Sequence, residues 1–155
     1  MGRTKTTSSV IFSRNTDEWR TPLDLFDKLN SKYHFDLDPC SMDENALCKK
    51  HFTKEQDGLQ QSWAGHHVFV NPPYGNVILW AQKCYFESRK NPGTICVLLV
   101  PSRTDTKWFH EYVYHKARLE FIRGRLFFGN AKNHAPFPSM LAIYGEDTNE
   151  EVRTW

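Results

Sequence analysis

The chain has 155 residues, the size of one domain, with 39% hydrophobic residues, 25% charged residues, 8 Gly and 8 Pro. This ordinary composition excludes disordered, collagen-like and disulfide-scaffold proteins. No apolar run approaches the roughly 20 residues of a membrane span, and no hydrophobic stretch follows the basic N-terminus. We therefore expect a cytoplasmic protein whose four cysteines are free thiols.

The net charge of +2 is small, but the charges are unevenly distributed. Residues 103–125 carry six Lys or Arg against three Asp or Glu, and residues 146–155 are mainly acidic. An anionic partner such as nucleic acid fits this pattern, and an ordinary solvated surface fits it equally well. We expect a flexible arm over residues 1–15, a folded domain over residues 16–145 and an acidic tail over residues 146–155.

Helices and strands are predicted to alternate along the chain. A helix is expected to begin near Thr21, because Thr is a favourable N-cap and Pro22 suits the first helical position. After it, a short strand is predicted to end at Leu37. Further strands are expected at residues 67–70, 94–100, 119–122 and 140–144, and helices at residues 77–90 and 105–114. This order indicates a single-domain α/β fold with a mostly parallel sheet flanked by helices.

Three of the predicted strands are each followed by a polar turn that contains proline. The turns occupy residues 38–41 (Asp-Pro-Cys-Ser), 71–74 (Asn-Pro-Pro-Tyr) and 101–103 (Pro-Ser-Arg). In open α/β sheets, ligands bind beyond the carboxyl ends of the strands. If the strands are parallel, all three turns line one edge, and that edge is the predicted functional site.

The turn Asn71-Pro72-Pro73-Tyr74 is the strongest local signal. Proline lacks an N–H group and fixes φ, so the segment presents acceptors without competing donors. The Asn71 side-chain oxygen and the Pro72 carbonyl can each accept one hydrogen of a planar exocyclic amine, and Tyr74 offers a ring for stacking. Two such acceptors stabilise the positive charge that develops when the amine takes up a methyl group. A plain turn is the alternative interpretation of the four residues alone.

This turn resembles the catalytic motif of S-adenosylmethionine-dependent amino-methyltransferases. Over most of its length, the chain resembles the phage-type DNA N6-adenine methyltransferases, the short Dam-like proteins of phages and prophages. The matching segments are Trp19-x-Thr21-Pro22, Phe35-Asp36-Leu37-Asp38, Asn45-Ala46, Asp57-Gly58-Leu59 with Trp63, residues 71–74, 101–106, 123–128 and 135–139. The resemblance implies a Rossmann-like fold, a methyl transfer to a flipped adenine in double-stranded DNA, and no metal.

The resemblance also implies roles for single residues. Trp19, Thr21 and Pro22 belong to the element that closes over the methionine end of the cofactor. Asp38 is placed to hold the cofactor's ammonium group and Asp57 to contact its ribose or adenine. Alternatively, Thr21 is only a helix cap and the two aspartates are turn residues.

Residues 71–74 would form the catalytic turn, and Asn71 would also contact the cofactor. Arg103, Arg123 and Arg125 are candidate contacts to DNA phosphates, with a solvated surface as the alternative. Residues 118–138 are expected to read a short DNA sequence. We assume a monomer, encoded by a phage or prophage and acting in the cytoplasm of a bacterial host.

The turn after the first strand contains no glycine, although many adenosylmethionine enzymes have a glycine-rich loop there. This departure leaves room for a catalytically inactive nucleic-acid-binding module. The catalytic turn alone also fits methylation of cytosine N4, of RNA adenine or of a protein amide. A Pro39-Cys40 nucleophile of the cytosine-C5 type is disfavoured, because the turn at residues 71–74 has no role in that reaction.

Overall fold

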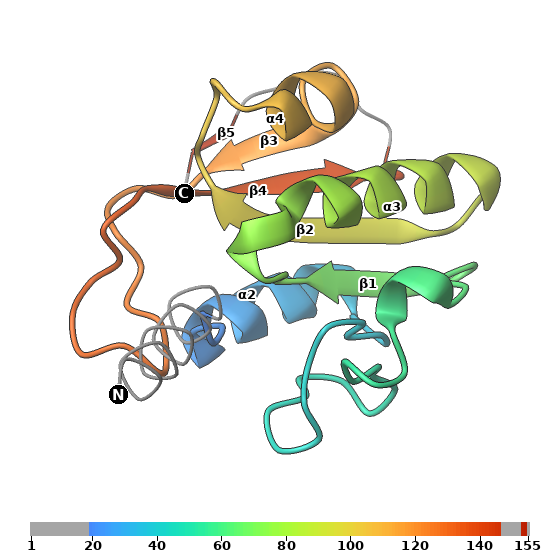
Figure 1. Ribbon diagram of the computed structural model, residues 1–155, viewed down its shortest axis with the longest axis horizontal. Helices are drawn as coiled ribbons and strands as arrows, with labels where there is room; N and C mark the ends of the chain where they lie inside the picture. Colours follow the sequence, from blue (N-terminus) through green and yellow to red (C-terminus); the bar gives the residue numbers. More distant parts are fainter. Residues whose placement is uncertain (1–18, 147–152, 155) are drawn as a thin grey trace, which may run out of the picture.

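The structure is a computed structural model that describes residues 19–146 and the backbone of residues 153–154. Five strands form one sheet in the order β1-β2-β4-β3-β5. The strands are β1 (His67–Val70), β2 (Ile95–Pro101), β3 (Arg118–Phe121), β4 (Ser139–Tyr144) and β5 (Arg153–Thr154). The helices are α2 (Leu23–Tyr33), α3 (Val77–Lys90) and α4 (Lys107–Tyr112), with 3-10 turns η1 (Gly58–Gln60) and η2 (Tyr74–Asn76) (Figure 1).

The sheet is mixed, so the prediction of a mostly parallel sheet needs correction. β1 pairs with β2, and β3 with β5, in parallel, but β4 is antiparallel to both of its neighbours, β2 and β3. Parallel neighbours need a crossover connection, usually a helix. Residues 122–138, which join β3 to β4, contain no helix, and the chain returns beside β3 in the opposite direction. The reversal is invisible in sequence, because every residue of β4 is buried.

Both faces of the sheet are covered, and side chains alternate between two cores. Val68 and Val70 pack with α3 and α4 on one face, while Phe69 packs with α2 on the other. β2 and β4 alternate in the same way, since successive side chains of a strand point to opposite faces. Figure 1 shows α3 and α4 on one side of the sheet and α2 on the other. The α/β class is therefore confirmed.

The predicted elements are found in the expected order, with small changes at their ends. α3 has the predicted bounds, and α4 is shorter than the predicted helix. The strand predicted to end at Leu37 is reduced to single bridges, from Leu37 to Val68 and from Asp38 to His51. Helix α2 begins at Leu23 with Pro22 as N-cap and without a side-chain cap. The cap interpretation of Thr21 is therefore wrong; its hydroxyl bonds Asn71 instead.

None of the helices in the described part of the chain has the length and apolarity needed to cross a bilayer. The expected arm at residues 1–15 lies outside the described residues, as does most of residues 146–155. Within that second segment, the backbone of β5 pairs with β3. The domain boundaries remain a prediction.

Candidate active site

The three predicted turns lie at one edge of the sheet. Leu37 bridges β1 in parallel, and β1 pairs in parallel with β2, so the turns that follow these segments leave the sheet on the same side. Two of the turns are in direct contact, because the Cys40 thiol donates to the Asn71 carbonyl at 3.4 Å. At the end of β2, Ser102 donates its backbone N–H to Pro138 (2.9 Å), which precedes β4. The edge is thus continuous from the first turn to the long loop.

The amide of Asn71 is held by three hydrogen bonds. Its Nδ2 donates to the Trp19 carbonyl and to Thr21 Oγ1, the latter at 2.9 Å. Its Oδ1 accepts from the Tyr74 hydroxyl at 3.1 Å. Residues 19–21 therefore contact the catalytic turn directly. This contact brings together Trp19, Thr21 and Asn71, which were all predicted from sequence as site residues.

An aromatic cluster surrounds these contacts. The Trp19 ring lies 5.3 Å from Phe128 and 5.2 Å from Phe137, and the Tyr74 ring lies 5.6 Å from Phe137. Such tilted and edge-on contacts stabilise the arrangement of the rings beyond the area they bury. Burial raises the pKa of the Tyr74 hydroxyl, so the group stays a neutral donor to Asn71. Phe128 and Phe137 were part of the resemblance, but the sequence alone did not place them at the site.

Asp38 is buried, with 4% of its surface exposed. Its carboxylate accepts the backbone N–H of Leu47 at 3.1 Å and that of Cys40 at 3.4 Å. Burial raises the pKa of the Asp38 carboxyl, and the two N–H groups oppose this shift. Among the described residues, no cation lies within salt-bridge distance of it. A buried carboxylate without an ion pair is costly, so a cationic group at this position would relieve the desolvation.

Asp57 lies on a segment that packs against the first turn. It has a left-handed backbone (φ 52°), and its exposed carboxylate accepts the N–H of Leu59 at 3.2 Å. The next residue, Gly58, is buried, and a Cβ there would lie 2.0 Å from the Pro39 carbonyl oxygen. The first turn itself contains no glycine, and Gly58 of a distant segment allows that segment to pack closely on its Pro39 carbonyl. The adjacency of Asp57 and Gly58 was visible in the sequence, but their packing partner was not.

Cys40 is unsuited to act as a nucleophile. Burial and the nearby Asp38 charge raise the pKa of its thiol well above the usual range, so the thiolate is scarce at neutral pH. Cytosine-C5 methylation requires a thiolate, and this chemistry is therefore disfavoured. All four cysteines are free in the structure. Within residues 19–146, no three His, Cys, Asp or Glu side chains gather as a possible metal-ligand set.

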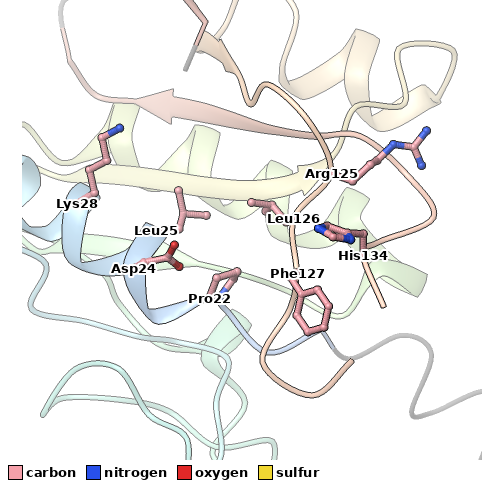
Figure 2. Close-up of a pocket in the computed structure, with 8 residues that line it drawn as sticks. All are labelled: Pro22, Asp24, Leu25, Lys28, Arg125, Leu126, Phe127 and His134. Carbon is pink, nitrogen blue, oxygen red and sulfur yellow. The ribbon is translucent and has the colours of Figure 1, made fainter. Parts of the chain in front are cut away.

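The three candidate DNA-binding arginines are exposed and follow strands that end at the active edge. Arg103 follows β2, while Arg123 and Arg125 follow β3. Arg125 also lines a surface pocket of about 320 Å³ between the start of α2 and the long loop (Figure 2). The pocket is lined by Pro22, Asp24, Leu25, Lys28, Arg125, Leu126, Phe127 and His134. The pocket does not include the catalytic turn. One of its lining residues, Pro22, follows Thr21 in the chain, and Thr21 contacts Asn71 of the turn.

An Asn-Pro-Pro-Tyr turn at the carboxyl edge of an α/β sheet is the arrangement expected from the resemblance to the amino-methyltransferase class. Comparison with known proteins defines the class further. The profile of the family described as DNA N-6-adenine-methyltransferase (Dam) matches residues 8–148. The chain belongs to this family, which confirms the resemblance predicted from sequence.

Two phage proteins show the same relationship. A DNA N-6-adenine-methyltransferase of Haemophilus phage HP1 (strain HP1c1) is 30% identical over 148 residues, which cover 89% of this chain and 84% of that protein. A DNA N-6-adenine-methyltransferase of Escherichia phage T1 is 29% identical over 138 residues, which cover 88% of this chain. The match spans 57% of the T1 protein.

Proposed function

We propose that this chain methylates N6 of adenine in double-stranded DNA, with S-adenosylmethionine as methyl donor. Family membership and the two phage relatives support the reaction. One observation about the chain itself supports it most: the Asn71 amide is fixed with its oxygen on the side of Tyr74. An amide oxygen held in place is the acceptor that an exocyclic amine needs.

The reaction follows from the groups of the catalytic turn. S-adenosylmethionine, when bound, supplies an electrophilic methyl group on its sulfonium sulfur. Asn71 Oδ1 and the Pro72 carbonyl accept the two hydrogens of adenine N6 and favour pyramidal geometry at the nitrogen. The lone pair would then bond to the methyl carbon as the bond from that carbon to sulfur breaks. The positive charge that develops on N6 is stabilised by two preorganised dipoles and disappears when N6 loses one of its two protons. Orientation of the amine toward the methyl group supplies much of the remaining rate enhancement.

The residues at the edge fit this cofactor. S-adenosylmethionine carries an ammonium and a sulfonium cation, and Asp38 is a buried carboxylate without an ion pair among the described residues. Two backbone N–H groups use only part of the acceptor capacity of a carboxylate, which has about four lone-pair positions. We propose that Asp38 holds the ammonium group, that exposed Asp57 contacts the ribose or adenine, and that Trp19, Thr21, Pro22 and Asn71 border the methionine end.

The topology supports a Rossmann-like arrangement in a modified form. β1, β2, β3 and β5 share one direction, and only β4 is reversed. Helices cover both faces, as in doubly wound sheets, and the reversed strand β4 lies inside the sheet, between β2 and β3. We propose that the ligands bind at the carboxyl edge of the four aligned strands.

DNA is proposed to bind against the exposed arginines at this edge. Arg103, Arg123 and Arg125 would neutralise phosphates, and the pocket of Figure 2 adds Lys28 of α2 and His134 of the long loop. Flipping the target adenine costs a few kcal/mol, which stacking on an aromatic side chain such as Tyr74 offsets in part. The phage origin of both relatives supports action on DNA inside a bacterial host.

The test is transfer of labelled methyl groups from S-adenosylmethionine to unmodified duplex DNA, followed by nucleoside analysis. We expect label in N6-methyladenine, and its loss in Asn71→Ala. Label in N4-methylcytosine would contradict the adenine assignment. Cofactor binding without transfer to DNA would turn the search to RNA or protein amines. Absence of cofactor binding would favour the inactive binding module.

A further inference from the structure

The orientation of the Asn71 amide depends on a segment distant in sequence. Residues 19–21, here called the strap, provide both acceptors for its Nδ2 hydrogens: the Trp19 carbonyl and Thr21 Oγ1. A backbone carbonyl can only accept a hydrogen bond. The atom of Asn71 that faces it must therefore be the nitrogen, and the oxygen must face the opposite side.

In this arrangement, Asn71 Oδ1 can accept one further hydrogen bond. An amide oxygen has two lone pairs, and the Tyr74 hydroxyl at 3.1 Å uses one of them. The second is left for a hydrogen of the substrate amine. If the amide were rotated by 180°, its oxygen would face the Trp19 carbonyl and its N–H groups would face the amine. Two oxygens would then face each other at Trp19, and N–H groups would face each other at the amine. Each of these polar groups would lose its hydrogen-bond partner.

The strap is itself anchored to the long loop between β3 and β4. Arg20 donates its backbone N–H to Asn130 Oδ1 and accepts from the N–H of Gly129, both at 3.0 Å. The Trp19 ring packs against Phe128, which is fully buried. These contacts lie directly before Thr21 in the chain and hold the strap on the long loop without using the Asn71 side chain.

We propose that the strap is the positioning device of the catalytic amide: Trp19 and Thr21 hold Asn71 with its oxygen toward the substrate amine. This rests on the proposed function, since it assigns Asn71 as the acceptor of the amine. The strap also explains why residue 71 is Asn, because an ionised Asp at this position has no hydrogen to donate to the Trp19 carbonyl. The expected contact of Thr21 with the cofactor is compatible with this role.

Two substitutions at Thr21 separate positioning from packing. Thr21→Val keeps the shape and removes the acceptor, whereas Thr21→Ser keeps the acceptor. We expect T21V to lower kcat about ten- to hundredfold, with the KM for DNA and the melting temperature close to the wild-type values. T21S should turn over at nearly the wild-type rate. Wild-type turnover in T21V would overturn the proposal, and so would an equal loss in T21S and T21V.

Asn71→Asp provides a readout that a packing role would not change. At neutral pH the carboxylate repels the Trp19 carbonyl, so turnover should be lost. At lower pH the protonated carboxyl can donate to that carbonyl, so part of the turnover should return, whereas the wild type shows no such gain. Activity that does not rise as pH falls would count against the role of the Trp19 carbonyl.

A measurement without turnover distinguishes this proposal from the proposed function. In ¹⁵N spectra of the free protein, the Asn71 side-chain NH₂ is identified by its absence in N71D. Its hydrogens should exchange slowly with solvent in the wild type and in T21S, and faster in T21V. Equal exchange in all three would overturn the proposal even if DNA is methylated. The wild type could also fail to methylate DNA while its Asn71 hydrogens exchange slowly and those of T21V exchange fast. That result would refute the proposed function but support the proposed orientation of the amide.

Discussion

Substituting Gly58 by alanine tests whether the first turn is shaped by a distant glycine. The new Cβ would lie 2.0 Å from the Pro39 carbonyl oxygen and 3.0 Å from the Pro39 carbonyl carbon. Both are backbone atoms of the turn that carries Asp38, so the strain cannot be released by rotating a side chain. Overpacking of this kind costs about 1–3 kcal/mol. In a chain of this size that corresponds to a fall in melting temperature of roughly 2–12 °C.

Gly129→Ala is the matched control. Its Cβ would meet the nearest atom, the Arg20 Cβ, at 3.7 Å, an ordinary contact. Neither Gly58 nor Gly129 has a positive φ, so alanine restricts the unfolded chain equally in both variants. The difference between the two melting temperatures therefore measures the clash. G129A should melt within a few degrees of the wild type.

The assay is thermal unfolding by circular dichroism, with and without S-adenosylmethionine. A ligand that binds only the folded state raises the melting temperature, and this increase should be smaller in G58A because the turn that carries Asp38 is displaced. If G58A melts like G129A, Gly58 does not pack against Pro39 as described. If G58A is destabilised but gains the full increase from the cofactor, the first turn does not belong to the cofactor site.

Three further predictions concern charge and reactivity at the active edge. Cys40→Ser keeps a donor for the Asn71 carbonyl and should leave methyl transfer largely intact in the labelled-DNA assay. Asp38→Asn should weaken S-adenosylmethionine binding measured by calorimetry. In the wild type, that affinity should fall as pH drops through the raised pKa of Asp38, because protonation removes the charge that we propose pairs with the ammonium group. The cofactor affinity of the variant should not change over this pH range. Arg123→Ala should reduce the salt dependence of DNA binding by about 0.9 in log–log slope, the value for one phosphate contact.

Each of these predictions has an outcome that contradicts it. Complete loss of activity in a folded C40S would restore Cys40 as a nucleophile. An acid-dependent loss of cofactor affinity that persists in D38N would assign the titration to another group. For DNA binding, Lys90→Ala is the control, because Lys90 is exposed at the opposite end of α3 from the catalytic turn. An equal change of slope in K90A and R123A would indicate a general charge effect.

The sequence predicted the elements well because their patterns are local. The apolar run of β2 and the spacing of α3 are properties of neighbouring residues, and both elements were found with nearly the predicted bounds. The direction of β4 was not predictable. A strand buried on both faces has the same composition whichever way it runs, and its direction is decided by a connection that contains no helix.

At the candidate site too, local features could be predicted from the sequence and tertiary contacts could not. The turn at residues 71–74 could be recognised because proline fixes its backbone locally. The helix-cap prediction for Thr21 was wrong, because a threonine before a proline is typical of a helix start, and only the tertiary structure shows its hydroxyl beside Asn71. The packing of Gly58 against Pro39 joins segments that are not adjacent in sequence, and no local signal indicates such a contact.

The reversed strand has a consequence for how this enzyme family can diversify. Because β4 runs against β3, the loop at residues 122–138 leaves and re-enters the sheet at the same edge, where Ile122 donates to the Ser139 carbonyl at 3.2 Å. Its ends are joined like the base of a hairpin, and Phe128, Ala135 and Phe137 between them are buried in the core, whereas residues 123–125 and 132–134 are exposed and can be exchanged without shifting it. We predict that exchanging these exposed residues for those of a relative changes the DNA sequence preference, while the contacts of Phe128 and Phe137 keep the catalytic turn in place.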